Sequence, residues 1–285
     1  MIEVGKTNTL TVTKMMDFGA YLDGENLGEI LLPRKHEPDN IDVGDELEVF
    51  VYLDSEDRPV ATTQKPKVEV GQFAYLEVKD TNRVGAFLDW GLDKDLMVPY
   101  GEQHRPLEVG KKVLVYVYLD KIDQRPTASS KVDKFLQDEN QGTFKPNQAV
   151  SLIIANSTDL GYKAIINHSH YGLLFKQDVF RRLSFGQSIK GFIKRIRQDG
   201  RIDLTLEGGK VTRDKDAEVI KRFLEKEGGF AAVHDKSDPE LIKKLFGMSK
   251  GAFKKTIGAM YKSGDITIEK TGIRLTTEKG TATRD

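Results

Sequence analysis

Residues 19–23 read GAYLD and residues 85–89 read GAFLD, 66 positions further along the chain. The same offset relates Val4-Gly5 to Val70-Gly71, Val43-Gly44 to Val109-Gly110, and VYLD at residues 51–54 to VYLD at residues 117–120. One extra residue in the last turn brings Arg58-Pro59 to Arg125-Pro126 at an offset of 67. A register that holds over about fifty residues predicts tandem copies of one small domain.

Each copy is predicted to contain five short strands, because hydrophobic residues alternate with polar ones between turn residues. In the fourth strand of the first copy, the residues from Leu47 to Leu53 at odd positions share one face. Glu48, Phe50 and Tyr52 share the other, which indicates a half-buried strand. Five strands in about 65 residues favour a closed barrel of the OB type. In the first copy they are residues 9–15, 18–23, 30–33, 47–54 and 60–63.

A third unit at residues 144–209 has diverged but keeps the same order of parts. Asp199-Gly200 is a hairpin signal between its last two strands. The five expected strands are residues 150–155, 160–167, 172–175, 186–197 and 201–206. Polar linkers are expected near residues 64–68 and 132–143.

After Gly209 the hydrophobic period changes from two to about 3.6. Ala217, Ile220, Phe223 and Leu224 predict one helical face, which ends at Gly228-Gly229. Asp238-Pro239 and Ser249 predict the starts of two more helices, and the buried side of the last would be Phe253, Ile257 and Met260. Residues 266–268 and 273–275 then predict a hairpin. Three helices followed by a hairpin are typical of a winged helix.

The chain is therefore predicted to be mainly β, with three tandem five-stranded OB-type barrels and a C-terminal α+β domain. The expected domains are residues 1–66, 67–142 with a linker, 143–212 and 213–285. The formal net charge of zero hides an asymmetry: these segments carry −8, −2, +6 and +4. A polyanion would be attracted to the C-terminal half and repelled by the first domain.

The composition gives no sign of a membrane or secreted protein. The chain has no cysteine, no apolar run near the ~18 residues that a membrane span needs, and no signal-peptide pattern at residues 1–5. We therefore expect a soluble, cytoplasmic protein.

The sequence also predicts no enzyme. It contains no phosphate-binding loop, dinucleotide fingerprint or nucleophile elbow. The histidines, His36, His104, His168, His170 and His234, show no spacing typical of a metal site. No catalytic residue, metal or cofactor is expected.

The repeats resemble S1 domains, the RNA-binding OB barrels whose second strand commonly reads Phe-Gly-Ala-Phe. Residues 17–21 fit closely, residues 84–87 nearly, and residues 199–206 match the closing strand of such domains. Three such barrels followed by a winged helix resemble the conserved virulence factor B family of bacterial RNA-binding regulators. The resemblance covers essentially the whole chain and depends more on the domain order than on a single motif.

The resemblance implies an RNA-binding position on each barrel, although no unit keeps the histidine that S1 domains usually carry after the third strand. By position, the RNA face would hold Phe18, Tyr21, Pro33, Asp54 and Arg58 in the first unit, Val84, Phe87, Pro99, Asp120 and Arg125 in the second, and Leu160, Lys163, Phe175, Arg197 and Arg201 in the third. Only the first unit keeps both aromatic residues of the second strand. Tyr21 and Phe87 could instead be rim packing of a small barrel.

Basic residues add further candidates in the C-terminal half. In the third unit they are Lys190, Lys194 and Arg195, beside Lys163, Arg197 and Arg201; in the winged helix they are Lys250, Lys254, Lys255, Lys262 and Arg274. Because cation–phosphate contacts dominate non-specific affinity, we expect stronger binding by the third unit than by the first. Replacing Lys194, Arg195, Arg197 and Arg201 with alanine should therefore weaken RNA binding more than replacing Phe18 and Tyr21. Solubility alone would also explain such charges.

The sequence thus predicts a non-catalytic RNA-binding regulator of gene expression that binds single-stranded RNA mainly through residues 143–285. A role in virulence is implied by the family resemblance alone. One alternative is a protein-interaction scaffold on the ribosome or RNA polymerase, and another is duplex DNA binding by the winged helix. The oligomeric state and the RNA targets stay open.

Overall fold

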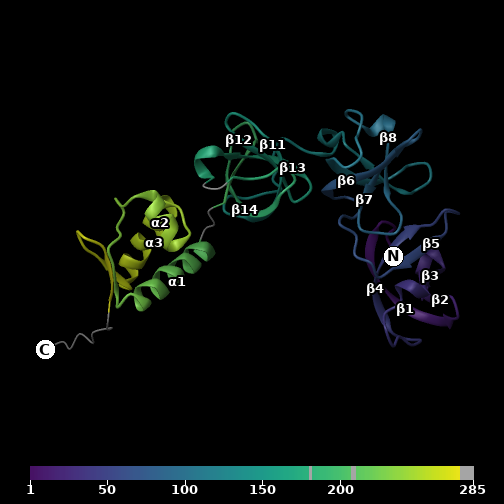
Figure 1. Cartoon of the computed structure of the whole chain (residues 1–285), viewed down its shortest axis with the longest axis horizontal. Coiled ribbons are helices and arrows are strands. Elements are labelled where there is room, and N and C mark those ends of the chain that lie inside the picture. The colour runs from purple at the N-terminus through teal and green to yellow at the C-terminus, as the bar shows by residue number, and fades with distance from the viewer. Residues whose placement is uncertain (180–181, 207–209, 277–285) are drawn as a thin grey trace.

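A computed structural model describes residues 1–179, 182–206 and 210–276, except for the side chains of residues 210–215. Figure 1 shows the helical domain on the left, the third barrel in the middle, and the second barrel above the first on the right. The predicted fold class is confirmed: three β units precede a small domain of helices and a sheet. The predicted domain limits at residues 66/67 and 142/143 stay predictions, and the one at 212/213 lies within a helix.

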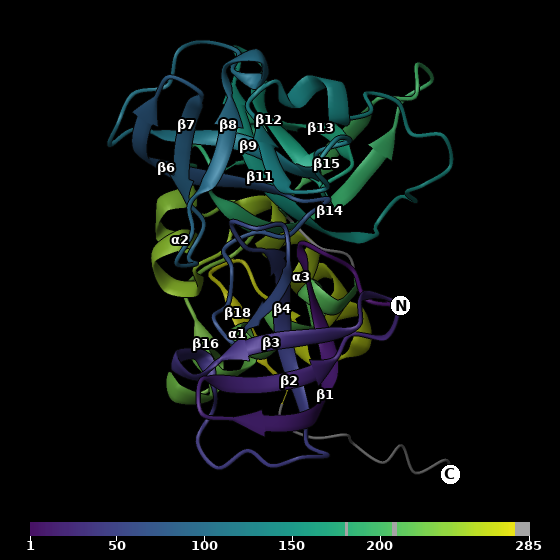
Figure 2. The ribbon, with the colours of Figure 1, turned by 90° about the vertical axis from the view of Figure 1, so that its right-hand side faces the viewer.

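The first unit is a closed barrel with strand order β1-β2-β3-β5-β4. Its strands are β1 (Lys6–Met16), β2 (Gly19–Asp23), β3 (Glu29–Pro33), β4 (Glu46–Leu53) and β5 (Pro59–Thr62), with short 3-10 helices η1 (Glu25–Leu27) and η2 (Arg34–His36). Val49 and Val51 lie in its core, as the alternation in β4 predicts. Figure 2 shows this barrel at the lower end of the view, with β1, β2 and β3 in front.

The second unit repeats this arrangement but is only nearly closed. Its strands are β6 (Phe73–Asn82), β7 (Gly85–Asp89), β8 (Leu96–Pro99), β9 (Lys112–Leu119) and β10 (Pro126–Ser129), with η3 (Tyr100–Glu102) after β8. The edge strands β8 and β10 lie beside each other, yet within residues 1–179 no hydrogen-bonded ladder joins them. In the first barrel the equivalent strands, β3 and β5, pair only at Leu31 and Val60. Even the closed barrel is therefore held together by few backbone hydrogen bonds at this point.

The third unit is again a closed barrel of the same strand order, which confirms the prediction from its diverged sequence. Its strands are β11 (Ala149–Ser157), β12 (Gly161–Ile166), β13 (His170–Phe175), β14 (Ser188–Ile196) and β15 (Ile202–Thr205), with η4 (Val132–Phe135) before β11 and η5 (Lys176–Asp178) after β13. Each first strand has a bulge at the same place, after Val12, Val78 and Ile154. Gly186 corresponds to the repeated glycines Gly44 and Gly110, and all three have positive φ, of 73°, 99° and 79°, which explains why glycine recurs there.

The C-terminal unit has the helices and hairpin of a winged helix. Its elements are α1 (Lys210–Lys226), β16 (Phe230–Ala231), α2 (Pro239–Phe246), α3 (Lys250–Ser263), β17 (Ile266–Ile268) and β18 (Ile273–Leu275). The predicted caps are confirmed, since the Asp238 carboxylate accepts from Glu240 N and the Ser249 hydroxyl accepts from Ala252 N. Strand β16, which was not predicted, pairs with β18. Residues 207–209 and 277–285, part of the third unit and of the last predicted domain, lie outside the described residues.

The two junctions between barrels are packed with hydrophobic side chains. Phe50, on the outer side of β4, is 1% exposed and meets Trp90 of the second unit edge-on at 5.5 Å. Tyr116 of β9 stacks on Phe135 at 4.1 Å. The prediction of a half-buried strand was therefore wrong in part for β4 and β9: the next unit buries Phe50 and partly covers Tyr116, while Glu48 stays exposed. The expected polar linker at residues 132–143 in fact contributes Val132, Phe135 and Leu136 to a hydrophobic cluster.

The second junction should depend on pH. The Phe73 amide donates to Nδ1 of His168 across this junction at 2.9 Å, and burial lowers the pKa of His168 below its usual value of 6.5. Because the unfolded chain then binds the proton more readily, this contribution to stability is full above pH 6.5 and is lost as the pH falls through the lowered pKa. We expect faster amide exchange at Phe73 at pH 5.5 than at pH 7.5, after correction for the intrinsic rate.

A His168→Asn variant is the control, because asparagine tolerates the left-handed backbone at this position (φ 56°) and does not titrate. The buried His170 has a lowered pKa as well and remains in the variant. If the pH response at Phe73 is the same in the variant, His168 is not its cause.

Candidate nucleic-acid interface

The first barrel brings its two predicted aromatic residues together at the surface. Tyr21 lies on β2, and Phe18 lies in the preceding turn with 53% of its surface exposed. Their rings meet edge-on at 6.1 Å, and the Lys14 ammonium lies 5.8 Å from the centre of the Tyr21 ring. Such a pair of rings can stack on nucleobases.

Arg58, the predicted cation of the same site, is already paired. Its Nε and Nη2 donate to Oδ2 of Asp54 at 2.9 and 2.8 Å, and Nη1 lies 3.0 Å from Glu56. Burial alone would raise the pKa of Asp54, but hydrogen bonds from the Arg58 side chain and from two backbone amides lower it to about 2. The carboxylates around Arg58 therefore offset much of its attraction for phosphate.

In the second barrel the structure separates the predicted residues. Phe87 is half-buried on β7 and Val84 is exposed in the turn before it. Arg125, by contrast, points to the first barrel, where its Nε donates to Asp57 Oδ1 and its Nη2 to the Asp54 carbonyl, both at 2.8 Å. Arg125 thus helps to hold the first junction, and its contact with RNA stays a prediction.

Sequence reasoning missed the residue that follows the third strand in the first two barrels. Tyr100 is 54% exposed and its hydroxyl donates to the Asn82 carbonyl at 2.6 Å, beside the turn that carries Val84. In the first barrel Arg34 makes the equivalent contact, from Nη1 to the Asp17 carbonyl at 3.0 Å. The signal was available, because both residues directly follow a repeated Leu-Pro or Val-Pro.

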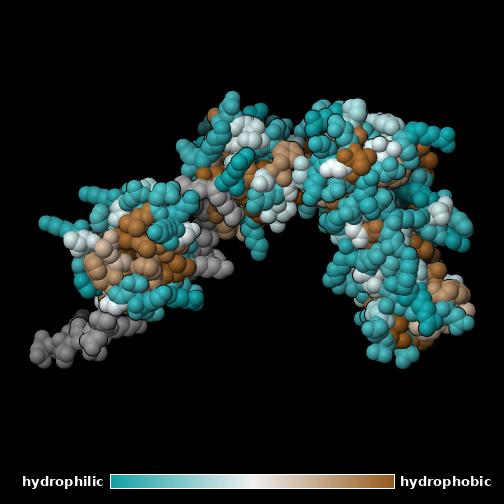
Figure 3. Space-filling view, viewed as in Figure 1, coloured by the Kyte–Doolittle hydropathy of each residue, from teal (hydrophilic) through white to brown (hydrophobic). Residues whose placement is uncertain are grey.

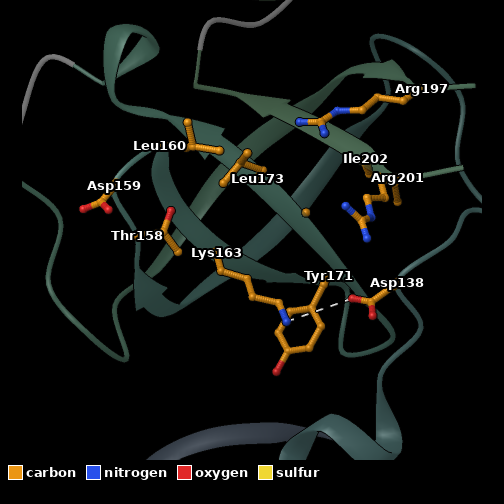
Figure 4. A pocket seen from close by; sticks show the side chains of 11 residues that line it. Asp138, Thr158, Asp159, Leu160, Lys163, Tyr171, Leu173, Arg197, Arg201 and Ile202 are labelled. Atoms are coloured by element: carbon orange, nitrogen blue, oxygen red, sulfur yellow. Dashed lines mark ion pairs between the residues drawn. The ribbon is translucent and has the colours of Figure 1, made fainter. Parts of the chain in front are cut away.

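The third barrel carries a pocket of about 560 Å³ at its predicted RNA face. Figure 4 shows Leu160 and Leu173 on one side and Lys163, Tyr171 and Arg201 on the other. The pocket is lined by Asp138, Thr158, Asp159, Leu160, Lys163, Tyr171, Gly172, Leu173, Arg197, Arg201 and Ile202. The structure thus brings together four of the five residues expected by position in this unit.

Lys163 lies at the centre of the charged side of the pocket. Its ammonium is 3.4 Å from the centre of the Tyr171 ring, and it lies 3.9 Å from Asp133 and 4.0 Å from Asp138, both of the segment before β11. The Tyr171 hydroxyl donates to Asp133, and burial followed by this hydrogen bond raises the pKa of Tyr171, so the phenol stays protonated at neutral pH. A phosphate would compete with these two carboxylates for Lys163.

Arg195 and Arg197 have a structural partner that the sequence prediction did not consider. Their Nε atoms donate to the two oxygens of Asp203, at 2.6 and 2.7 Å, and the Asp203 side chain is 1% exposed. Burial alone would raise the pKa of Asp203, but the hydrogen bonds from both arginines outweigh it and lower the pKa. Phe175, the fifth expected residue, lies 5.6 Å from the Arg197 guanidinium.

The remaining predicted residues lie on β14 and on the winged helix. Lys190 and Lys194 are exposed on β14, and Lys194 pairs with Asp178 at 2.7 Å. On α3, Lys254, Lys255 and Lys262 are exposed and Lys250 is half-buried. On β18, Arg274 donates to Glu269 at 2.7 Å and lies 4.7 Å from the Phe230 ring. Figure 3 shows hydrophobic residues gathered over α2 and α3, whereas polar residues dominate the barrels.

Comparisons with known proteins match both parts of the chain. The S1 domain family matches residues 4–64 and 70–131, and the CvfB-like winged helix domain matches residues 218–275. YitL from Bacillus subtilis is 28% identical over 280 residues, covering 92% of this chain and 90% of YitL. Conserved virulence factor B from Staphylococcus epidermidis is 27% identical over 285 residues, covering 96% and 95%. A crystal structure described as a multidomain protein with nucleic acid binding domains, from Streptococcus pneumoniae, is 23% identical with a TM-score of 0.39, covering 96% and 98%.

Fold and matches together define the class: a protein of tandem S1 barrels with a C-terminal winged helix, both of which are nucleic-acid-binding domains. Within this class, the matched winged helix and the nearly full-length similarity place the chain in the conserved virulence factor B family. Neither matched domain family is catalytic. Among the described residues there is no helix long and apolar enough to cross a membrane.

Proposed function

We propose that this protein is a non-catalytic, cytoplasmic regulator of gene expression that binds single-stranded RNA, mainly through residues 143–285. The observation that carries the proposal is the pocket of the third barrel, where Lys163, Arg197 and Arg201 surround apolar walls of Leu160 and Leu173. Cations at the rim suit phosphates, and apolar walls suit the faces of unpaired bases. The net charges of +6 and +4 in residues 143–212 and 213–285 add long-range attraction.

The names of the relatives support a role in virulence, since several are called conserved virulence factor B. The first barrel, with a net charge of −8 over residues 1–66, would contribute stacking by Phe18 and Tyr21 against an unfavourable field. It therefore acts as a weaker, secondary contact for the same RNA strand.

Salt dependence tests the proposal. Fluorescence anisotropy of a labelled single-stranded RNA with the full chain should give a log affinity that falls linearly with log salt. An Arg201→Ala variant should weaken binding of all RNA sequences alike and reduce the slope by about 0.7, because one phosphate contact on a single strand is lost. Arg201 suits this test because its side chain is 67% exposed.

Lys121→Ala is the matched control, since Lys121 is exposed on the turn between β9 and β10, away from the pocket. Duplex DNA of the same length serves as competitor. Binding with no salt dependence, or displacement of the RNA by duplex DNA at equal concentration, contradicts the proposed function.

A second candidate is docking of the winged helix on a protein of the translation or transcription machinery. It is favoured by three exposed apolar side chains, Leu241, Tyr261 and Ile268, with exposed fractions of 41%, 57% and 40%. Exposed apolar patches often mark protein-binding surfaces. Loss of binding to ribosomes or RNA polymerase in a Tyr261→Ala variant, with RNA affinity unchanged, would support this candidate.

A further inference from the structure

The outer face of the fourth strand is the same structural position in all three barrels. The pairing of first and fourth strands fixes the equivalence, because Leu10, Leu76 and Leu152 pair with Leu47, Val113 and Ile189. The next residue therefore starts the outer face in each barrel. This face consists of Glu48, Phe50 and Tyr52 on β4 and of Leu114, Tyr116 and Tyr118 on β9. On β14 it starts with Lys190 and Phe192, and Lys194 follows at a bulge in the pairing of β14 with β15.

In the first two barrels this face is where the following part of the chain docks. On β4, Phe50 is covered by Trp90, and nearby Lys35 and His36 of η2 pair with Asp93. On β9, Tyr116 and Tyr118 stack on Phe135 at 4.1 and 5.7 Å, and Lys134 pairs with Glu102 of η3. The central aromatic residue of the face is thus covered in both cases, fully for Phe50 and partly for Tyr116.

On β14 the same face is basic, and its central ring is partly open. Lys190 is exposed and Phe192 is half-buried. Among the side chains that the structure describes, Phe192 belongs to no buried hydrophobic cluster and pairs with no other aromatic ring. The strand beside it has only Ala149 and Ser151 opposite Phe192 and Lys190, so small side chains flank the ring. A ring between two lysines, with small neighbours, leaves room for a flat ligand.

We propose that Lys190, Phe192 and Lys194, the β14 strip, form a second contact for single-stranded RNA, continuous with the pocket of the third barrel. The inference rests on the proposed function and extends it to a different face of the barrel. Lys190 is two residues before Phe192, about 6.6 Å along the strand, and Lys194 is two residues after it at the bulge. A base stacked on Phe192 therefore has a lysine before it and another after it for its flanking phosphates. Charge complementarity selects a polyanion here, whereas the two equivalent faces receive apolar side chains.

The chain itself links the strip to the pocket. Strand β14 runs from Lys190 through Lys194 to Ile196, and Arg197 directly after it lines the pocket together with Arg201. An RNA strand that leaves the pocket past these arginines reaches Lys194 next and then Phe192. The Lys194 ammonium pairs with Asp178 at 2.7 Å, so a phosphate would share it with that carboxylate.

The length of the RNA distinguishes the strip from the pocket. OB folds cover about 4 to 16 nucleotides, so a 4-nucleotide RNA should fill the pocket alone and a 16-nucleotide RNA should reach the strip as well. We expect the full-length double variant Lys190→Glu/Phe192→Ala to bind the 16-nucleotide RNA at least about tenfold more weakly, through one lost stack and one reversed charge, and to bind the 4-nucleotide RNA with less than a twofold change. Lys121→Glu, with the same charge change on the second barrel, should leave both affinities within about twofold.

Each outcome decides between the strip and the pocket. If the double variant unfolds at lower temperature than the native chain, the single variant Lys190→Glu, at an exposed position, gives the answer with an expected loss of about threefold on the long RNA. Unchanged affinity for the 16-nucleotide RNA in both variants overturns the strip and leaves the pocket in place. An equal loss on both lengths also overturns it. If the native chain binds neither RNA at low salt, the proposed function itself fails.

Discussion

Replacing Arg195 and Arg197 together by alanine will lower the free energy of unfolding of the third barrel by about 3–5 kcal/mol. The Asp203 side chain is 1% exposed, and these two guanidinium groups satisfy its two oxygens. Their removal leaves a buried carboxylate without a countercharge, and the cost of breaking a buried pair comes mainly from that uncompensated charge. Hydrogen exchange in peptides covering β14 and β15 localises the effect to this barrel.

The loss of unfolding free energy in this double variant should be smaller at low pH. In the native protein the pKa of Asp203 lies below its usual value of 3.8, so its contribution to stability is present above that value and is lost as the pH falls through the lowered pKa. Without the arginines, burial raises the pKa, and protonation of the folded variant then restores part of its stability. A gap between variant and native protein that stays constant from pH 7 to pH 4 would contradict this account.

Arg201→Ala is the matched control, because the Arg201 side chain is 67% exposed and lies 3.8 Å from Asp199 in a surface turn. Its stability should change by less than about 0.5 kcal/mol. The same contrast bears on any test of RNA binding. Replacing Lys194, Arg195, Arg197 and Arg201 together would mix lost RNA contacts with a destabilised barrel, so Lys163, Lys190 and Arg201 are the better positions to vary.

The fold could be predicted from the sequence wherever a pattern repeats locally. The 66-residue register, the alternation in β4 and the caps at Asp238 and Ser249 each report on a residue and its near neighbours, and all three led to elements that the structure contains. Near closure of the second sheet was beyond such patterns, because it depends on how β8 and β10, which are far apart along the chain, come to lie beside each other.

The candidate site was harder to predict. The number of charged and aromatic residues in a segment does not indicate which other residues of the chain they contact. Asp203 lies between Ile202 and Leu204 in the closing strand, all three buried, so a carboxylate inside a hydrophobic run was a readable sign that nearby arginines would be needed as its partners. Arg125 gave no such sign, since its partner Asp57 belongs to another barrel. Residues that act across a junction can be assigned only once the units are placed next to each other.

The same reasoning explains why the outer aromatic residues of the fourth strands were misjudged. In sequence, Phe50, Tyr116 and Phe192 are alike: each occupies the solvent side of an alternating strand. In the structure the following unit buries Phe50 and partly covers Tyr116, whereas Phe192 is half-buried between two lysines. The difference is the segment that covers Phe50 and Tyr116, which lies about 20 to 40 residues further along the chain than the residue it covers.

Replacing Phe50 by alanine should open the first junction and move the fluorescence of Trp90 to longer wavelength. Trp90 is the single tryptophan of the chain and is 3% exposed, with its ring edge-on to Phe50 at 5.5 Å and its indole N–H donating to the Lys94 carbonyl. Phe50 belongs to the hydrophobic core of the second barrel although it lies on β4 of the first. Its truncation removes a fully buried ring and should cost about 3–5 kcal/mol in the unfolding of this two-barrel unit.

Phe18→Ala provides the control, because it removes the same ring from a position that is 53% exposed on the same barrel. We expect no shift of Trp90 emission there and a change in stability below about 1 kcal/mol. Since Lys35, His36 and Gln64 also contact Asp93 across the junction, the Phe50 variant should retain a weakened interface that high salt loosens further. Unchanged emission in Phe50→Ala would mean that the second barrel alone buries Trp90, and would contradict this account of the junction.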